Sequence, residues 1–376
     1  MGKLLNVFKI DFDSNRIYGL DTLRAFAILI VVLGHGGRLL SPEIEKNIFL
    51  FIPDGVSIFF VLSGFLIGRI LIKILENEKP SISKLFKFWS RRWLRTLPVY
   101  YIILILLILL SYLFDKEFNI VKVKNFFIFC QNFFKSDYSF FLVSWSLSVE
   151  EWFYLLIPLF IFLAINAAKL KRPKEVIFST VVILIISTIA FRFYRYNTTD
   201  VSTPEIFDTM FRRPVVTRLD GIMFGVAGAY LIYYHHLLFS RNKNMLFVIG
   251  LSLHVFIKIA NDFFFANNAF YFCNFSFVFE ALATLLLLPF LSQLNTGKGI
   301  LYKVITVVSL ISYSMYLLHA EIVQNWMIRF INIPHLDKVS LLIVKYFLYW
   351  VLTILISILS YKYIEIPFMK LRKNHN

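Results

Sequence analysis

Apolar stretches of about 20 residues, the length that an α-helix needs to cross a bilayer, recur along the whole chain. Backbone polar groups in lipid must be satisfied within the spanning segment, which favours helices. The sequence therefore predicts an all-α, polytopic membrane helical bundle of about ten transmembrane helices. The ten predicted spans lie near residues 20–38, 55–75, 97–114, 146–167, 176–194, 215–234, 245–264, 274–293, 304–324 and 341–363.

Composition supports a membrane protein, since 59% of the residues are hydrophobic and the mean hydropathy is +0.71. The formal charge of +16 would suggest nucleic acid in a soluble protein, but here no nucleic-acid partner is expected. Lys and Arg collect in cytoplasmic loops of membrane proteins. With the N-terminus inside, the predicted cytoplasmic segments hold 23 Lys and Arg residues and the external segments 13. This bias predicts cytoplasmic termini and a multi-pass protein of the inner (cytoplasmic) membrane.

The predicted organisation is a cytoplasmic segment at 1–19, a transmembrane domain at 20–363 and a cytoplasmic tail at 364–376. The first apolar run has no small-residue cleavage site after it, so we interpret it as a retained helix. No linker to a further domain is recognisable. Only two cysteines occur, Cys130 and Cys273, and neither has metal-site spacing. No metal is expected, and a bond between the two thiols is left open.

The first predicted span carries an arginine and a histidine, Arg24 and His35. An ionisable side chain inside a membrane is a functional-site hypothesis by default. Eleven residues are close to three helical turns, so both side chains lie on one helix face, roughly 16 Å apart along the axis. One cation and one titratable base therefore share a stripe across the membrane.

The fourth span carries adjacent carboxylates, Glu150 and Glu151, near its predicted outer end. Glu150 shares a helix face with Ser146 and Tyr154, which favours a functional role for it. For Glu151, a position facing the membrane interface is an equally good interpretation.

Two further spans carry polar groups near their predicted outer ends. Arg218 and Asp220 are two residues apart and point to different helix faces, so each is expected to pair with another helix, and a structural ion pair is a competing interpretation. Ser312, Tyr316 and His319 follow one helical stripe, and His319 is either a packing residue or a supporting functional residue.

The second span and the segment before the third span hold the remaining candidate functional residues. Gly64 is expected to allow close helix packing, and Ser63 beside it is predicted to line a narrow passage. Arg91, Arg92 and Arg95 follow one another in a basic, aromatic segment on the predicted inner side. Such a patch either meets lipid headgroups or binds a phosphorylated cofactor, because guanidinium groups match phosphate geometry.

Together these residues resemble the membrane-bound acyltransferase family 3, whose members O-acylate bacterial polysaccharides and some small molecules. The resemblance covers essentially the whole chain. Its marks are Arg24-x10-His35, Phe59-Phe-x-x-Ser-Gly-Phe65, Arg91-Arg92-x-x-Arg95, Trp145-Ser-Leu-Ser-Val-Glu150 with Phe153-Tyr154, Arg218-Leu-Asp-Gly221, Ser312-Tyr-Ser-x-Tyr-x-x-His319 and Glu365-x-Pro367. Trp152 departs from the pattern, because many relatives have Gln there.

The resemblance implies an acyl donor, usually acetyl-CoA, that is used from the cytoplasm, and an acceptor hydroxyl on a saccharide or lipid-linked glycan at the outer face. It also implies functional roles for Arg24 and His35, for the arginines before the third span and for Glu150. Some relatives carry an extra extracytoplasmic esterase-like domain. None is recognised here, so transfer is expected to finish in the membrane part or with a separate partner.

These features suggest a mechanism with His35 as general base on the acceptor hydroxyl and Glu150 as the carboxylate that orients its imidazole. Arg24 is predicted either to hold the donor or to stabilise the thioester oxyanion. An acyl-enzyme intermediate is the second variant. The competing function is a proton-coupled exporter of a glycan or small solute. Membrane lipid is an expected partner, and homo-oligomer formation is left open.

Overall fold

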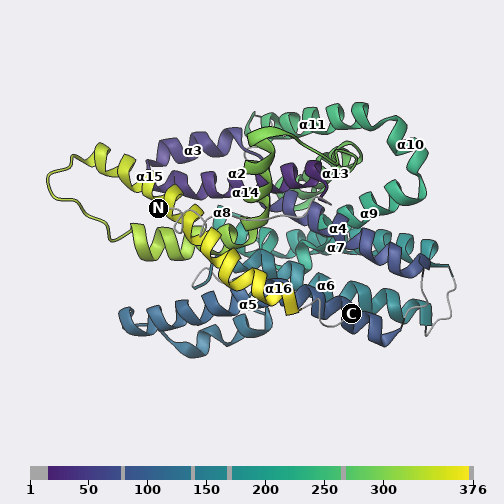
Figure 1. The fold of residues 1–376 in the computed structure, drawn as a ribbon, viewed down its shortest axis with the longest axis horizontal. Coiled ribbons are helices and arrows are strands. Elements are labelled where there is room, and N and C mark those ends of the chain that lie inside the picture. Colours follow the sequence, from purple (N-terminus) through teal and green to yellow (C-terminus); the bar gives the residue numbers. More distant parts are fainter. Residues whose placement is uncertain (1–15, 78–80, 137–139, 167–171, 264–267, 372–376) are drawn as a thin grey trace.

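The computed structural model describes residues 16–77, 81–136, 140–166, 172–263 and 268–371. These residues form helices and no strands. Most of the long helices run roughly along the long axis of the molecule (Figure 1). Nine helical segments of the described part of the chain are long and apolar enough to cross a membrane. The predicted all-α polytopic bundle is therefore confirmed.

The long helices, in chain order, are α2 (Tyr18–Gly36), α4 (Gly55–Asn77), α5 (Ile82–Phe114), α6 (Ser144–Asn166), α7 (Pro173–Thr198), α9 (Leu219–Tyr234), α11 (Lys243–Phe263), α13 (Phe277–Leu291), α14 (Gly299–Leu318) and α15 (Lys338–Ser360). The short α-helices are α3 (Pro42–Phe51), α8 (Pro204–Phe207), α10 (His236–Arg241), α12 (Ala269–Tyr271) and α16 (Ile366–Leu371). The 3₁₀ segments are η1 (Gly37–Leu39), η2 (Ile120–Ile128) and η4 (Val215–Thr217). The π-helical segments are η3 (Asp208–Arg212), η5 (Phe272–Ser276), η6 (His319–Ile328) and η7 (Tyr361–Glu365).

Two terms describe the ends of the bundle. The basic end is the end where α5, α7 and α14 begin, and the opposite end is the end where α4, α6 and α15 begin. The charge bias of the loops predicts that the basic end is cytoplasmic.

The sixth predicted span, 215–234, forms a shorter helix than expected. The chain makes a 3₁₀ turn after Pro214, and the helix α9 begins only at Leu219. The hydroxyl of Thr217 donates to the carbonyls of Phe211 and Pro214, which holds this turn in place. The 16 residues of α9 cover about 24 Å, less than the hydrocarbon thickness of a typical bilayer.

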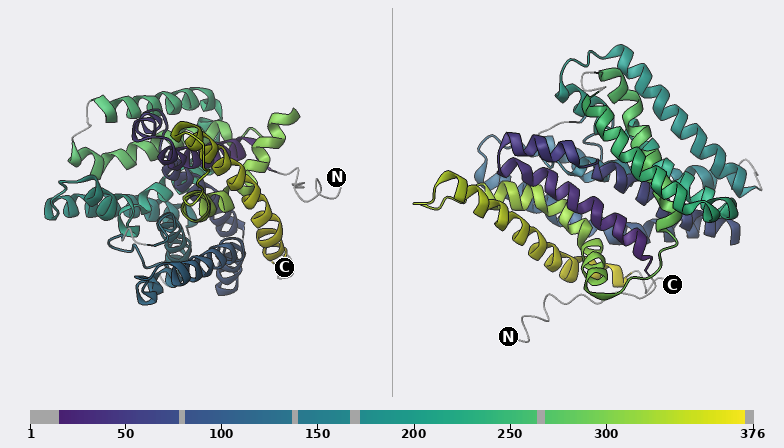
Figure 2. Two further views of the ribbon diagram at one scale, coloured as in Figure 1. Left: turned by 90° about the vertical axis from the view of Figure 1, so that its left-hand side faces the viewer. Right: turned by 90° about the horizontal axis from the view of Figure 1, so that it is seen from above.

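Small residues allow α4 and α9 to cross closely at the centre of the bundle. A Cβ atom on Gly64 would lie 1.8 Å from the carbonyl oxygen of Ile222, and one on Gly225 would lie 2.0 Å from that of Val61. The prediction that Gly64 serves helix packing is confirmed. Beside the helices α4 and α9, the helix α2 packs against α14. Figure 2 shows α2 and α14 next to each other in the view from above.

Two helices extend beyond their predicted bounds. The helix α5 begins at Ile82, where the Ser81 side chain accepts a hydrogen bond from the backbone amide of Lys84. The basic segment before the third predicted span is therefore part of one 33-residue helix. The last span passes the predicted limit of 363 through η7 and α16 and ends at Leu371. Residues 1–15 and 372–376, in the two predicted terminal segments, lie outside the described residues.

The two cysteines are separate. Cys130 is half-buried, Cys273 is buried, and both are free thiols. The bond that the sequence left open is therefore not formed.

Candidate functional site

Two cavities lie inside the bundle, one above the other along α2. The arginine cavity, about 90 Å³, is lined by side chains of α2, α4, α5, α6 and α14 that include Arg24, Ser63 and Glu150. The histidine cavity, about 250 Å³, is lined by His35 and by residues of the α3–α4 connection and of η3, α11, η5 and α13. Val56, in the first turn of α4, lines both cavities. The predicted stripe of Arg24 and His35 thus connects two neighbouring cavities.

Three guanidinium groups meet in the arginine cavity. Arg24 enters from α2, and Arg92 and Arg95, which are three residues apart on one face of α5, enter from the other side. Arg24 and Arg95 form no hydrogen bond or ion pair with another described residue. The acid nearest to Arg24 on its own helix, Asp21, accepts hydrogen bonds from Arg16 and Ser309 instead. Two cations without a counter-ion make this cavity suited to an anionic or strongly polar ligand.

Arg92 takes part in a chain of hydrogen bonds across the same cavity. Its guanidinium lies 4.2 Å from the ring centroid of Tyr154 and donates to the Tyr154 hydroxyl at 2.5 Å. Tyr154 donates to one oxygen of Glu150 at 2.6 Å, and Ser63 donates to the other at 3.1 Å. Both oxygens of Glu150 are therefore occupied by hydroxyl groups.

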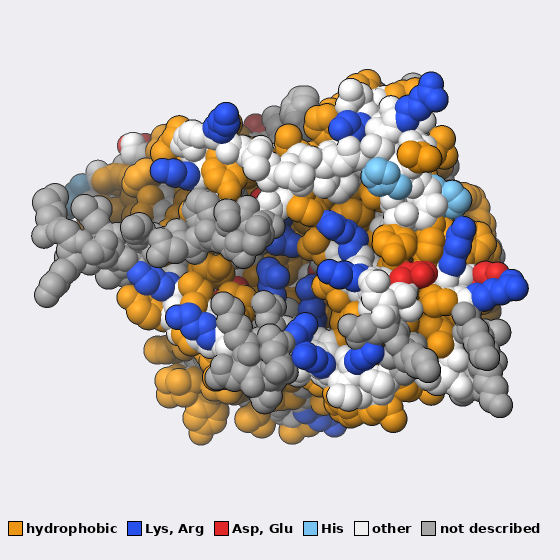
Figure 3. Space-filling model, turned by 45° about the vertical axis from the view of Figure 1, so that its right-hand side comes forward, with side chains coloured by type: hydrophobic (Ala, Val, Ile, Leu, Met, Phe, Trp, Pro, Cys, Tyr) orange, Lys and Arg blue, Asp and Glu red, His pale blue; other side chains and the backbone are white. Residues whose placement is uncertain are grey.

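The face at the basic end carries many Lys and Arg side chains around a hollow, with few acidic side chains (Figure 3). Arg91 has an exposed side chain and does not line the arginine cavity. Of the three predicted phosphate-binding arginines, the structure thus brings Arg92 and Arg95 into the cavity and leaves Arg91 on the surface.

A histidine pair stands beside the histidine cavity. The Nδ1 atom of His35 lies 2.8 Å from the Nε2 atom of His319, and Nδ1 of His319 lies 2.9 Å from the carbonyl oxygen of Met315. A carbonyl only accepts, so a neutral His319 carries its proton on Nδ1 and accepts at Nε2. His35 then donates from Nδ1, and its Nε2 atom keeps a lone pair that accepts no hydrogen bond from another described residue.

The expected contact between Glu150 and His35 is replaced by this pair. Glu150 lines the arginine cavity, His35 lines the histidine cavity, and the hydrogen-bond partner of the imidazole is His319. The interpretation of Glu150 as the orienting carboxylate of His35 is therefore wrong. The i, i+4 pairing of Glu150 with Tyr154, noted in the sequence, holds its carboxylate in the other cavity.

Tyr316 connects the two groups of residues. Its side chain lines the arginine cavity and its hydroxyl accepts a hydrogen bond from Ser146 at 2.7 Å. Its ring centroid lies 6.0 Å from that of His319 and 6.5 Å from that of Phe59. The predicted stripe of Tyr316 and His319 thus runs from the arginine cavity to the histidine pair.

Arg218 and Asp220 contact other helices, as expected. Asp220 forms an ion pair of 2.7 Å with Arg192 of α7, and neither side chain is exposed to solvent. Arg218 donates to the Ser57 hydroxyl at 2.8 Å and lies 4.0 Å from the ring centroid of Phe277. These contacts lie beside the histidine cavity.

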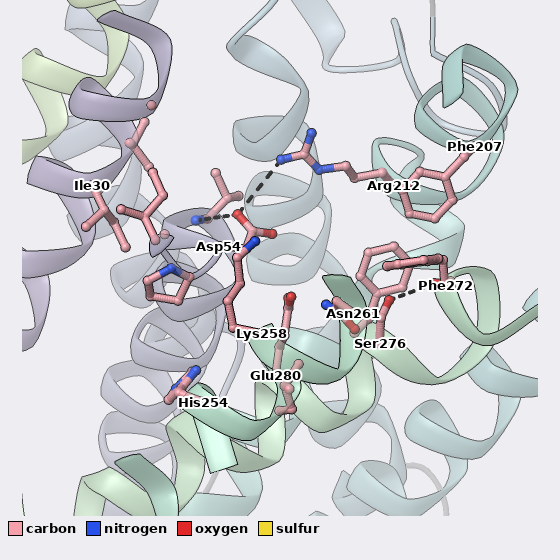
Figure 4. Close-up of a pocket in the computed structure, with 18 of the residues that line it drawn as sticks. Ile30, Asp54, Phe207, Arg212, His254, Lys258, Asn261, Phe272, Ser276 and Glu280 are labelled. Atoms are coloured by element: carbon pink, nitrogen blue, oxygen red, sulfur yellow. Dashed lines mark hydrogen bonds and ion pairs between the residues drawn. The ribbon is translucent and has the colours of Figure 1, made fainter. Parts of the chain in front are cut away.

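A charged cluster in the histidine cavity was not predicted. Figure 4 shows Asp54, Arg212, Lys258, Asn261 and Glu280 around this cavity, contributed by separate segments of the chain. Lys258 and Glu280 are ionisable residues within spans, and that property was the only sequence signal for them. Asn261 lies in α11, and Asp54 and Arg212 lie between long helices, where no spacing links them to His35.

Asp54 is the member of this cluster that precedes the start of α4. It accepts hydrogen bonds from the Val56 amide at 3.1 Å and the Ser57 hydroxyl at 2.8 Å, and it lies 4.0 Å from the Arg212 guanidinium. Burial acts to raise the pKa of Asp54, but Arg212 and Arg218, together with the hydrogen bonds from Ser57 and Val56, outweigh burial and hold this pKa below its ordinary value. The carboxylate is therefore ionised at neutral pH.

Two π-helical segments, η3 and η5, line the histidine cavity, and a third, η6, begins at the histidine that contacts His35. Arg212 ends η3, Phe272 and Ser276 bound η5, and His319 begins η6. Single π-helical turns inside α-helices are frequent at functional sites, because the extra residue redirects side chains. Within the described ranges, no group of three or more His, Cys, Asp or Glu side chains is placed to hold a metal ion.

The fold and these cavities define a multi-pass membrane protein with a polar site inside its helical bundle. Comparison with known families identifies the kind of protein. A model described as an acyltransferase domain matches residues 17–362. The chain belongs to the membrane-bound acyltransferase family 3, as the motifs predict.

Curated relatives include proteins of Staphylococcus aureus. The chain is 28% identical over 373 residues to the protein named "Putative O-acetyltransferase SACOL0978" of strain COL, covering 94% of this chain and 57% of that protein. It is 27% identical over 386 residues to "O-acetyltransferase OatA" of strain NCTC 8325, covering 96% of this chain and 58% of the relative. The chain thus spans little more than half the length of these relatives. No solved structure matches it significantly.

Proposed function

We propose that the chain is an O-acetyltransferase of the inner (cytoplasmic) membrane, which transfers an acetyl group from cytoplasmic acetyl-CoA to a hydroxyl of a saccharide or lipid-linked glycan at the outer face. The observation that carries this proposal is the pair of adjoining cavities. One presents arginines without counter-ions, and the other presents a histidine with a free basic nitrogen. The family and the names of the relatives support the reaction class.

The arginine cavity is the proposed donor site. Arg24 and Arg95 have no anionic partner, and guanidinium groups bind phosphate and carbonyl oxygens through forked hydrogen bonds. The cavity of about 90 Å³ is too small for a whole nucleotide, so the phosphates and the base would lie toward the basic face. The pantetheine arm and thioester would then enter the cavity past Arg95 and Arg24.

The histidine cavity is the proposed acceptor site. Its acidic, basic and amide groups, Asp54, Glu280, Lys258 and Asn261, supply hydrogen-bond acceptors and donors that suit a polyhydroxylated ring. Aromatic side chains from η5 and α13 line the same space and suit the apolar face of a sugar. A saccharide would meet both kinds of group there.

In the proposed reaction, Nε2 of His35 takes the proton of the acceptor hydroxyl while its oxygen attacks the thioester carbonyl carbon. The tetrahedral intermediate then collapses, the carbon–sulfur bond breaks, and the proton on His35 passes to the departing sulfur. The products are an acetyl ester and the CoA thiol. His319 holds the His35 ring in the required tautomer. Because Arg24 is about 16 Å from His35 along the helix, we assign it to holding the donor rather than to the oxyanion.

The test uses purified protein in lipid nanodiscs with acetyl-labelled CoA and a panel of oligosaccharides. We expect acetyl ester formation that is lost in His35→Ala and retained in Arg172→Gln, a control on an exposed surface ion pair. Ester formation by His35→Ala at the wild-type rate would overturn the assignment of the base. Movement of a saccharide across the membrane without consumption of acetyl-CoA would favour the exporter instead.

A further inference from the structure

A third cavity lies on the side of the bundle, away from the proposed reaction. This lateral cavity, about 220 Å³, is formed between α5, α6 and the end of η2. Its lining is aromatic and aliphatic and contains one acidic side chain, Glu151. The side chains of Phe127 and Ile128 at its edge are 42% and 63% exposed, so the cavity opens toward the surface of the bundle.

The wall made by η2 lies deep along α5. The hydroxyls of Tyr100 and Tyr101 donate to the carbonyls of Phe126 and Phe127 at 2.8 Å. Tyr101 is 13 residues before the end of α5 at Phe114, about 20 Å along the helix. The chain therefore leaves α5 and returns along it toward the middle of the span. Backbone of this kind at membrane depth is tolerated where it is buried or lines a cavity.

Two of the donors that border the lateral cavity are already engaged with backbone carbonyls. Trp152 donates from its indole nitrogen to the carbonyl of Phe129 at 3.0 Å, and the Tyr101 hydroxyl donates to Phe127. Phe129 has a left-handed backbone, with φ of 56°, which turns the chain at this point. These contacts hold the wall in place. A third donor, the indole of Trp93, lies near Glu151, which is the acidic group that can meet a ligand.

One carboxylate oxygen of Glu151 has a hydrogen-bond partner and the other has none. Glu151 is 6% exposed, and its Oε1 atom accepts a hydrogen bond from the Thr96 hydroxyl at 2.8 Å. Oε2 is buried and has no hydrogen-bond partner among the described residues. A buried polar atom without a partner costs free energy, and the structure offers a cavity beside it where a partner would fit.

We propose that the lateral cavity binds a lipid-type alcohol, with its apolar body against the aromatic side chains and its hydroxyl donating a hydrogen bond to Oε2 of Glu151. The apolar lining and the open edge suit a ligand that arrives from the hydrocarbon phase. A hydroxyl fits the apolar lining better than an ammonium group, because taking a charged group out of water costs more free energy than taking a hydroxyl. This proposal does not rest on the proposed acetyl transfer.

The experiment uses protein in nanodiscs and three photoreactive probes with the same dodecyl chain, ending in a hydroxyl, a methyl ether or a primary ammonium group. Cross-linked residues are mapped by mass spectrometry. We expect the alcohol to label residues of α5, η2 and α6 that line the lateral cavity, at about fivefold to tenfold lower concentration than the ether, as the loss of one hydrogen bond predicts. Equal labelling by the ether, or stronger labelling by the ammonium probe, would overturn the proposal.

Two variants separate binding from folding. Glu151→Met removes the acceptor and should abolish the preference for the alcohol over the ether. Leu155→Trp leaves Glu151 in place but fills the cavity, so it should suppress labelling by all three probes. Glu175→Gln, an exposed residue of α7, is the control and should label as wild type. Each variant is first shown to be monodisperse, and unchanged labelling of a monodisperse Leu155→Trp protein would sink the proposal.

Discussion

The Nδ1 atom of His35 lies 2.8 Å from the Nε2 atom of His319, although 284 residues separate them in the chain. Because the Met315 carbonyl fixes the proton of His319 on Nδ1, the pair sets the tautomer of His35 and leaves its Nε2 atom basic. In the proposed reaction, His319 would thus do what a carboxylate does in hydrolytic triads. A neutral partner orients the ring without adding a negative charge to the membrane interior.

This relationship makes His319 a positioning residue. We expect His319→Ala to lower kcat by about 10²-fold or more, within the range that general base catalysis contributes, with little change in the KM for acetyl-CoA. His319→Gln places an amide oxygen near Nδ1 of His35 and should recover part of the rate. Steady-state kinetics on both variants checks this, and equal activity of His319→Ala and wild type would contradict it.

The arginine cavity predicts an effect on the KM for acetyl-CoA rather than on kcat. Arg95→Gln should raise the KM for acetyl-CoA about 10- to 100-fold, since a charge-assisted hydrogen bond contributes about 1.5–3 kcal/mol, and should change kcat less. Arg95→Lys keeps the charge but loses the fork, so an intermediate KM is expected. Isothermal titration calorimetry with CoA measures the binding affinity directly. Arg172→Gln, at an exposed ion pair, is the control and should match wild type.

The crossing of α4 and α9 predicts a sharp difference between two glycines. In Gly64→Ala the new Cβ would meet the Ile222 carbonyl at 1.8 Å, so the helices must separate, and we expect a loss of about 2–4 kcal/mol in the free energy of unfolding. In Gly221→Ala the nearest atom is a Phe60 carbon at 3.5 Å, which is ordinary contact. Thermal unfolding in detergent compares the two. A Gly64→Ala protein as stable as Gly221→Ala would contradict the close crossing.

The buried pair of Arg192 and Asp220 predicts non-additive mutations. Neither side chain is exposed, so removing one partner strands a charge, and Asp220→Leu should cost about 3–5 kcal/mol of stability. Replacing both residues, as Arg192→Met with Asp220→Leu, should recover much of this loss. A double-mutant cycle by denaturant or thermal unfolding measures the coupling. Additive losses would show that the two side chains act separately.

Asp54 predicts a loss of stability in acid. Its pKa is lowered in the folded protein, so its contribution is present above the unfolded value of about 3.9 and is lost as pH falls through the lower, folded value. Protonation weakens its contacts with Arg212 and with the start of α4. Unfolding temperatures measured between pH 6 and pH 3 should fall more steeply for wild type than for Asp54→Asn. Parallel curves would contradict this role.

The sequence by itself determined the class of fold and the family. Apolar runs long enough to cross a membrane predicted helices, because helices satisfy their own backbone hydrogen bonds in lipid. Gly64 marked a close contact between two helices. Periodicity placed Arg24 and His35 on one face, and it placed Glu150 with Tyr154, because those relations lie within a single helix.

Only the tertiary structure decided which residues of different helices meet. It gave His35 the partner His319 rather than Glu150, and it separated Arg24 and His35 into two cavities that share Val56. It also brought Asp54 and Glu280 beside His35. The physical reason is that helical periodicity specifies the direction of a side chain around its own axis, whereas the contacts between helices depend on how their surfaces pack.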